Sequence, residues 1–309
     1  MTARSLLGIH HITAITGDAA SNVDFYARVL GLHLVKKTVN YDAPDVYHLY
    51  FGAETGEPGS VLTFFEFPAA PRGAAGAGMI HRISFDVASQ AALAYWKARL
   101  ADASVATSQG QGFLRFRDPE DLELELMVDE YAPSEFAAVA PDIPPENRLR
   151  GFRGVSAYSA LPAASQPLLS VLGFARRSGD AYVIGSANRI ASYAYSPPAD
   201  VQPKQGAGTV HHIAWACPDQ DQPDWRRALV EAGAQVTPII DRTYFHSIYF
   251  REPSGVLFEI ATLGPGFAVD EPPDSLGETL TLPARYEWMR AELEGRLTPI
   301  ENPRQVRTG

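Results

Sequence analysis

The strongest constraint on the fold is a pattern that occurs four times along the chain. Each copy opens with a short β-type run, continues with a helix-like stretch, and closes with further β-type runs. The four openings are GIHHITAIT (8–16), MIHRISFDV (79–87), FRGVSAYSA (152–160) and TVHHIAWAC (209–217). A supersecondary unit that repeats in this way indicates internal duplication. The sequence therefore predicts an α+β fold of four βαβββ units that form two barrel-like halves.

A segment rich in proline and acidic residues divides the four units into two pairs. This segment, 129–151, has the composition of a linker. The expected divisions are an N-terminal half 1–128 with units at 8–67 and 79–128, a C-terminal half 152–264 with units at 152–196 and 209–264, and a tail 265–309. We expect one helix in the tail, near 284–297.

Composition excludes several classes of function. The formal net charge is −10 and the sequence pI is about 5.3, which argues against a nucleic-acid or anionic-membrane partner. No apolar run approaches the length of a membrane span, and the N-terminus lacks the apolar core of a signal peptide, so we expect a cytoplasmic protein. Cys217 is the single cysteine, so no intrachain disulfide can form. Dinucleotide-binding, P-loop and nucleophile-elbow motifs are absent from the sequence.

Two histidine doublets are the main candidates for chemistry. His10 and His11 lie in the opening run of the first unit, and His211 and His212 lie at the equivalent place in the fourth. Adjacent residues on a strand point to opposite faces, so only one member of each doublet can point squarely into a shared cavity. The pattern alone does not say which member that is.

Glu259 is the natural third partner for two histidines. It lies among apolar residues in the closing run VLFEIAT of the fourth unit, where an unpaired carboxylate is costly to bury. A metal ion or an ion pair would remove that cost. Two histidines and one carboxylate are the ligand set of non-haem Fe(II) oxygenases, although Zn(II), Mn(II) and Ni(II) accept the same donors. We therefore expect a divalent metal site.

A competing site would combine the first two units. It would use His11 with His81 and Glu125, and Glu66 is a further acid in the first unit. The third unit offers neither a histidine in its opening run nor an acid in its closing run. The metal site is therefore built either by units one and two or by units one and four.

Other polar residues gather before the last predicted strand. Arg242, His246 and Tyr249 lie in the run DRTYFHSIYFREPSG, 241–255. Arginine is a natural partner for an anionic phenolate, and tyrosine or histidine can move protons. His48, in the aromatic run VYHLYFG, is interpreted instead as a core residue.

Several of these motifs occur in an order that resembles a known family. They are IHHITAITGDAASNVDFY, LVKKTVNYD, YHLYFG, VHHIAW and DRTYFHSIYFREPSGVLFEIATLGPGF. The resemblance spans roughly residues 8–285. It is to the Fe(II)-dependent hydroquinone ring-cleaving dioxygenases of the vicinal-oxygen-chelate superfamily, which also contains glyoxalases, bleomycin-resistance proteins and extradiol dioxygenases.

The resemblance implies a role for each candidate residue. His11, His212 and Glu259 would hold Fe(II), or Mn(II) or another divalent ion, with units one and four paired around it. The other residues that it implies are the catalytic Tyr249, Arg242, His10 and His211 and the substrate-binding Thr13 and His246. The substrates would be O2 and a small hydroquinone-type aromatic, and the protein could form a homo-oligomer.

Two other functions share the same fold. One is a metal-dependent glyoxalase-type isomerase or lyase, whose sites usually need a fourth protein ligand. In the pairing of units one and four, only Glu66 is available for that role. The other is a metal-free small-molecule binding protein, which would have no need of the two histidines and the glutamate.

Overall fold

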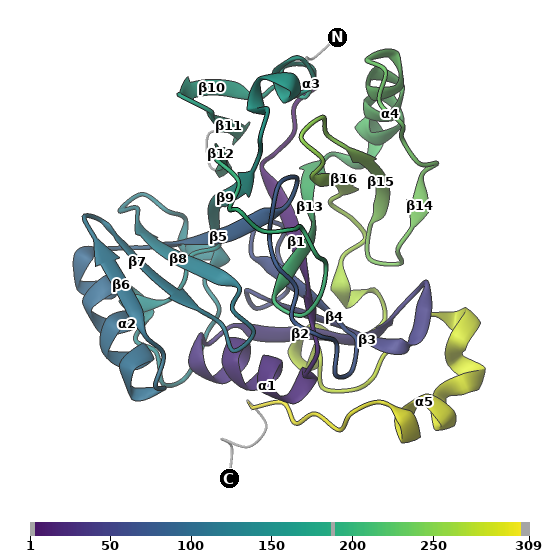
Figure 1. The fold of residues 1–309 in the computed structure, drawn as a ribbon. Coiled ribbons are helices and arrows are strands. Elements are labelled where there is room, and N and C mark those ends of the chain that lie inside the picture. The colour runs from purple at the N-terminus through teal and green to yellow at the C-terminus, as the bar shows by residue number, and fades with distance from the viewer. Residues whose placement is uncertain (1–3, 187–188, 304–309) are drawn as a thin grey trace.

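The computed structural model describes residues 4–186 and 189–303, and its strands form two eight-stranded sheets (Figure 1). The first sheet has the strand order β14-β15-β16-β13-β1-β4-β3-β2. Its strands are β1 (Ile9–Thr16), β2 (His33–Asn40), β3 (Ala43–Gly52), β4 (Val61–Glu66), β13 (Thr209–Cys217), β14 (Ile240–Asp241), β15 (His246–Arg251) and β16 (Leu257–Thr262). This sheet is made by units one and four.

Units two and three form the second sheet, in the order β10-β11-β12-β9-β5-β8-β7-β6. Its strands are β5 (Ile80–Val87), β6 (Thr107–Gly110), β7 (Phe113–Arg117), β8 (Glu123–Val128), β9 (Phe152–Tyr158), β10 (Ala175–Ser178), β11 (Ala181–Ser186) and β12 (Arg189–Ser196). The α+β class and the four repeated units are thus confirmed. Each sheet draws one unit from each side of the 129–151 segment, so that segment divides the sequence but not the sheets.

Each unit carries its helix between its first and second strands. The helices are α1 (Ala19–Val23), which continues as a π-helical turn over Asp24–Val29, α2 (Gln90–Asp102), α3 (Gln166–Val171) and α4 (Gln222–Glu231). In α2, Ser89 caps the N-terminus by accepting the N–H of Ala92, and Leu93, Trp96 and Leu100 are fully buried. Their spacing of three and four residues places them on one face of the helix.

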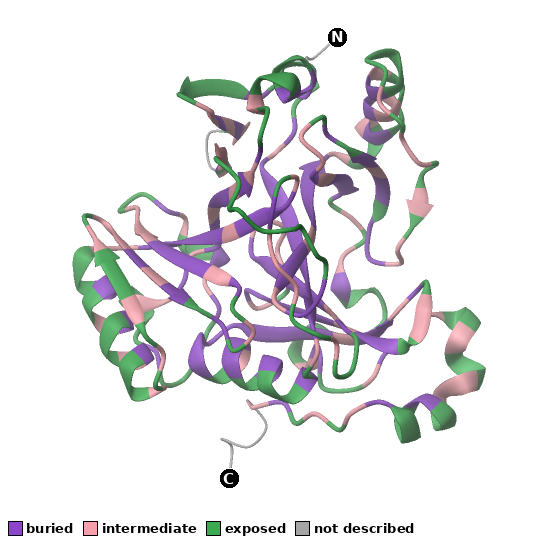
Figure 2. Ribbon diagram, viewed as in Figure 1, coloured by how far each residue is buried: buried purple, intermediate pink, exposed green. Residues whose placement is uncertain are grey.

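The strands at the centre of each sheet are buried (Figure 2). β1 and β13 run side by side through the middle of the first sheet, and every residue of β1 is buried. No helix among the described residues is long and apolar enough to cross a membrane.

The tail is fixed to the first sheet by a buried lysine. It includes a 3-10 segment, Ala284–Met289, and α5 (Arg290–Arg296). Lys36 of β2 has no solvent exposure, and its Nζ lies 2.6 Å from Asp270 and 2.5 Å from Glu271. The ammonium group also sits 4.9 Å from the centre of the Tyr244 ring. One cation therefore joins a strand of unit one, the tail and the loop before β15.

Replacing Lys36 by Met should destabilise the protein by roughly 3 kcal/mol, because it leaves Glu271 buried without its cation. The measurement is the free energy of unfolding from urea titration. Lys97→Met is the matched control, since Lys97 is exposed on α2. Equal stability of the two variants would show that the buried ion pairs do not hold the tail.

Candidate metal centre and cavity

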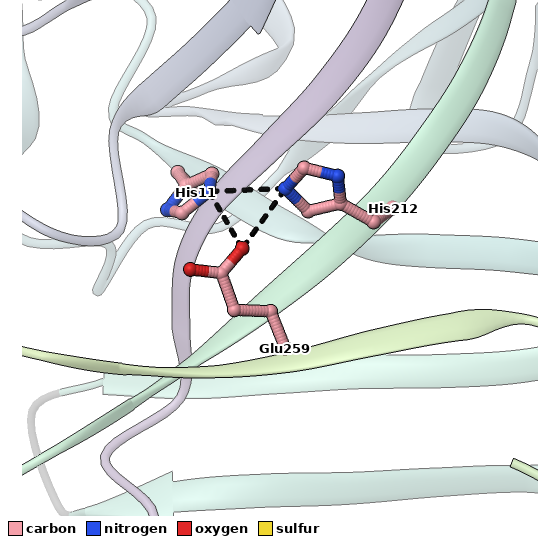
Figure 3. A group of neighbouring side chains, drawn as sticks. All are labelled: His11, His212 and Glu259. Atoms are coloured by element: carbon pink, nitrogen blue, oxygen red, sulfur yellow. Dashed lines mark hydrogen bonds and ion pairs between the residues drawn. The ribbon is translucent and has the colours of Figure 1, made fainter. Parts of the chain in front are cut away.

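Three adjacent strands bring His11, His212 and Glu259 together (Figure 3). The His11 and His212 Nε2 atoms are 3.3 Å apart, and Glu259 Oε2 lies 3.3 Å from the first and 2.9 Å from the second. The three residues are 3%, 5% and 0% exposed. Three donor atoms that face one another within such distances, on β1, β13 and β16, form a pocket of the size that a single cation occupies.

Two β-bulges in the β1–β13 pair explain how the doublets are oriented. Ile9 pairs with Trp215 and His11 with Ala214, so His10 is an extra residue on β1. Thr13 pairs with His212 and Ala14 with Val210, so His211 is the extra residue on β13. A bulge changes the direction in which side chains leave the strand. Both second members, His11 and His212, point to the same place.

The first member of each doublet supports the second. The Nδ1 atoms of His10 and His11 are 2.9 Å apart, and those of His211 and His212 are 2.7 Å apart. His10 is buried against the ring of Phe245, at 4.9 Å between centroids. His211 is only half-buried and lines the adjoining cavity. The two supporting histidines thus have similar contacts but different exposure.

Burial lowers the pKa of His10, His211 and His212, which favours their neutral form. It is the largest cause of the low pKa of His212 and holds the pKa of His10 well below its ordinary value. Burial, followed by the charge on His212, lowers the pKa of His211 to about 3. A neutral imidazole is the form that binds a metal.

Glu259 is ionised despite its burial. Burial alone raises the pKa of this carboxyl, but the neighbouring imidazoles of His11 and His212 bring its pKa well below the ordinary value. The Ser247 hydroxyl donates to Oε1 at 2.5 Å. Oε2 has no hydrogen-bond partner among the described residues apart from its approach to the two histidines. Ser247 therefore fixes the carboxylate with one oxygen aimed at the histidines.

A cavity of about 430 Å³ opens beside these three residues. Its lining residues are His11, Ile15, Asn40, Tyr41, Asp42, His48, Tyr50, Phe65, Phe67, His211, His212, Arg242, Phe245, Tyr249 and Leu257. Aromatic and aliphatic side chains form much of the wall, and polar groups are few. This combination is typical of sites for small, flat organic molecules.

Two polar groups in the cavity are positioned by hydrogen bonds. Arg242 donates from Nε to the Tyr249 hydroxyl at 3.2 Å, and its Nη1 lies 3.1 Å from Asp42. Burial raises the pKa of Tyr249, so its phenol stays protonated. His48 contacts the Tyr50 hydroxyl at 2.8 Å and the Thr63 hydroxyl at 2.9 Å. The cavity thus has one cationic edge and one edge of neutral hydrogen-bonding groups.

The sequence-predicted residues Thr13 and His246 do not line this cavity. Thr13 is fully buried behind it and accepts a hydrogen bond from Thr63 at 2.8 Å. His246 is exposed at the start of β15, and it alternates with Ser247 and Tyr249, which face Glu259. Because side chains alternate along a strand, His246 lies on the opposite face of β15 from Tyr249, and its contact with substrate stays a prediction.

Sequence reasoning missed several residues of the cavity wall. His48 was interpreted as core, yet it lines the cavity with Tyr50, two residues further along the same face of β3. Asn40 and Asp42, at the turn between β2 and β3, also line it. The alternation of His48 and Tyr50 was the available signal, because residues at this spacing share a face.

The competing residues of unit two take part in other interactions. The ring of His81 stacks on Tyr158 at 3.8 Å. Glu125 accepts hydrogen bonds from Ser84 and Arg115 at 2.7 and 2.6 Å, in the second sheet. Glu66 accepts the N–H of Ala19 at the start of α1. The structure therefore does not assemble the alternative set of ligands.

Comparison with known protein families identifies the superfamily of this chain. Residues 8–126 and 170–260 match the family described as the glyoxalase/bleomycin resistance protein/dioxygenase superfamily. The chain belongs to this superfamily. Glyoxalase I from Zea mays shares its fold, with a TM-score of 0.58, 13% identity, and coverage of 82% of this chain and 92% of that one.

Some similar proteins match over nearly their whole length. A protein of Bacillus subtilis named "Putative ring-cleaving dioxygenase MhqO" is 42% identical, over 97% of this chain and 98% of that protein. The chlorohydroquinone/hydroquinone 1,2-dioxygenase of Sphingobium indicum is 34% identical, over 93% and 94%. A Bacillus subtilis crystal structure titled as a putative dioxygenase has a TM-score of 0.89 and 41% identity, over 97% and 99%.

Replacing Ser247 by Ala should weaken divalent-metal binding by roughly 10–100-fold, because the carboxylate loses the hydroxyl that orients it. Metal affinity measured by competition with a chromophoric chelator tests this. Ser170→Ala, on the exposed face of α3, is the control. Unchanged affinity in Ser247→Ala would mean that Glu259 is held by its strand alone.

Proposed function

We propose that this protein is a non-haem Fe(II)-dependent dioxygenase that cleaves the ring of a hydroquinone-type aromatic with O2. The observation that carries the proposal is the convergence of His11, His212 and Glu259 beside a cavity sized for one ring. The near-full-length similarity to a hydroquinone 1,2-dioxygenase supports the reaction class.

The donor set fits a divalent cation. Two neutral imidazoles and one carboxylate carry a total charge of −1, and their donor atoms approach one another with the carboxylate oxygen otherwise unpartnered. This ligand set is the facial triad of Fe(II) oxygenases, and Mn(II) accepts it too. When bound, the ion would lower the pKa of a coordinated phenol and supply the redox chemistry that O2 needs.

The doublets would set the tautomers that such a site requires. For Nε2 of His11 to act as a ligand, its Nδ1 must carry the proton. That proton is donated to Nδ1 of His10, at 2.9 Å. His212 would donate to His211 in the same way, at 2.7 Å. Each first histidine therefore acts as a positioning residue for the second.

The cavity residues would orient the substrate and transfer protons to and from it. Arg242 would stabilise the phenolate oxygen, because a guanidinium is an always-charged, multidentate donor. Tyr249, whose hydroxyl contacts Arg242 at 3.2 Å, would donate or accept a proton at its Oη, and His211 at its free ring nitrogen. The second hydroxyl of a hydroquinone lies para to the first. It would reach the neutral edge formed by His48 and Tyr50.

The aromatic walls would keep the reacting ring away from bulk water. Phe65, Phe245 and Leu257 line the cavity, and the ring of Phe245 packs 5.0 Å from that of His11. Exclusion of water strengthens the interaction between Arg242 and an anionic oxygen, because the local dielectric constant falls. It also protects a reactive substrate from side reactions.

Replacing Glu259 by Gln should remove most of the bound metal, because a neutral amide is a poor substitute for the carboxylate. The matched control is Glu125→Gln, which changes a buried glutamate at the corresponding closing strand of unit two. Metal content after loading and desalting is the measurement, with circular dichroism to verify folding. If Glu259→Gln keeps its full metal content and Glu125→Gln loses it, the metal site lies in the second sheet and the proposal is wrong.

The reaction is tested by loading the protein anaerobically with Fe(II) and then measuring O2 uptake. Hydroquinone should be consumed with one O2 per ring, and Tyr249→Phe should lower turnover by roughly 10²-fold or more, the typical size of one proton-transfer contribution. Catechol and a methylglyoxal–thiol adduct are assayed in parallel. Turnover of the thiol adduct without O2 uptake on any phenol would replace the dioxygenase proposal by an isomerase.

A further inference from the structure

The second sheet repeats the geometry of the first without its metal ligands. In the β5–β9 pair, Ile80 pairs with Ala157 and Arg82 with Ser156, so His81 is an extra residue like His10. Ser84 pairs with Gly154 and Phe85 with Phe152, so Arg153 is extra in the same way as His211. The two bulges therefore occur at matching places in both sheets.

The strand pairing of the second sheet shows which residue stands at the position of each candidate metal ligand of the first. Arg82 takes the place of His11, and Gly154 takes the place of His212. Ala194 pairs with Ser156 as Glu259 pairs with Ala214, so Ala194 takes the place of Glu259. The second sheet has thus lost all three donors.

A cavity of about 570 Å³ nevertheless remains on the corresponding face. Asp86, Arg153 and Ser192 line it, and by register they correspond to Ile15, His211 and Leu257, which line the first cavity. Residues 131–133 and Phe136 also line it, together with Gly8, Ile9 and Gly59 of unit one. The cavity is therefore the counterpart of the candidate active site, with different chemistry.

Positive charge dominates the lining of this second cavity. Four arginines and two aspartates line it among the described residues: Arg150, Arg153, Arg177, Arg189, Asp86 and Asp129. The excess is notable in a chain with a net charge of −10. Arg153 pairs with Asp129 and lies 3.7 Å from Asp86. Within the described part of the chain, Arg150, Arg177 and Arg189 form no ion pair with a carboxylate, and Arg150 and Arg189 donate to backbone carbonyls instead.

Apolar side chains complete the site. Phe136, Phe152 and Val183 line the cavity beside the arginines. A fork of guanidinium donors matches a carboxylate, and an apolar wall favours a carbon skeleton over a hydrated inorganic anion. We propose that this second cavity, on the sheet formed by units two and three, binds a small organic carboxylate.

Asp86 adds a pH dependence to this binding. It is 7% exposed, and its Oδ1 has no hydrogen-bond partner among the described residues. Burial, partly opposed by Arg153 and reinforced by Asp129, raises its pKa to about 7. The other charges that line the cavity are Arg150, Arg177 and Arg189. Protonated Asp86 can donate to a carboxylate, whereas ionised Asp86 repels it, so affinity falls as the pH rises through 7.

The test uses 19F NMR of 4-fluorobenzoate with the metal-free, full-length protein in the absence of substrate. Saturable binding with a Kd below about 1 mM at pH 6 is expected. Arg177→Ala should weaken it by roughly tenfold, the worth of one charged hydrogen bond. Arg177 is exposed, so its removal leaves the core intact. Arg176→Ala is the matched control on the same strand, because Arg176 is exposed and pairs with Asp180. That control should leave the affinity unchanged.

Two further variants separate this site from the candidate active site. Arg242→Ala should retain binding, and Asp86→Asn should remove the loss of affinity between pH 6 and pH 8. Displacement of 4-fluorobenzoate by muconate reports whether a second carboxylate adds affinity, and inorganic phosphate should not displace the probe. The proposal is overturned if no saturable binding occurs, if phosphate competes fully, or if Arg242→Ala abolishes binding that Arg177→Ala retains. None of these results bears on the dioxygenase proposal, since neither metal nor O2 is present.

Discussion

The antiparallel pair of β1 and β13 is the contact on which the rest of the structure depends. It joins units whose histidines lie 201 residues apart in the sequence, and its two bulges bring His11 and His212 to the same point. β16 then places Glu259 beside them through its parallel pairing with β13. A slip of one residue in this register would turn the side chains of one strand to the opposite face of the sheet and so separate His11 from His212. The buried apolar residues of β1, among them Ile12 and Ala14, oppose such a slip.

Much of the fold and the three converging residues could be predicted from the sequence, because both depend on repeated local patterns. The doublets recur at equivalent places, and Glu259 is conspicuous in an apolar strand. The choice of His11 and His212 over their neighbours rested on a resemblance, because bulges leave no clear trace in a sequence. The cavity wall was harder to predict, since His48 reaches it only through the pairing of β3 with β4. His246 and Tyr249 are three residues apart on one strand, and this odd spacing places their side chains on opposite faces.

The two sheets show how one architecture can support different interactions. In the first sheet, the buried carboxylate of Glu259 faces the imidazoles of His11 and His212. In the second, Arg82 binds Glu123 at 2.5 Å and Arg115 binds Glu125 at 2.6 Å. There, each acid has a guanidinium as its counter-charge, so no external cation is needed. In the second sheet the position of His11 is therefore held by Arg82, which forms an internal ion pair with Glu123 of β8, and the position of Glu259 is held by Ala194.

The low pKa of His212 favours its neutral form, and a neutral imidazole gives the buried Glu259 carboxylate no full counter-charge. The carboxylate is fully buried, and an isolated ion in that environment is costly. Ser247 offsets part of this cost with one hydrogen bond to Oε1 but leaves Oε2 aimed at the histidines. A divalent cation at that point would interact with the carboxylate in a region of low dielectric constant, where the attraction is strong. The burial that makes this carboxylate expensive therefore also makes it an effective ligand, and the strand pairing that buries it sets its direction.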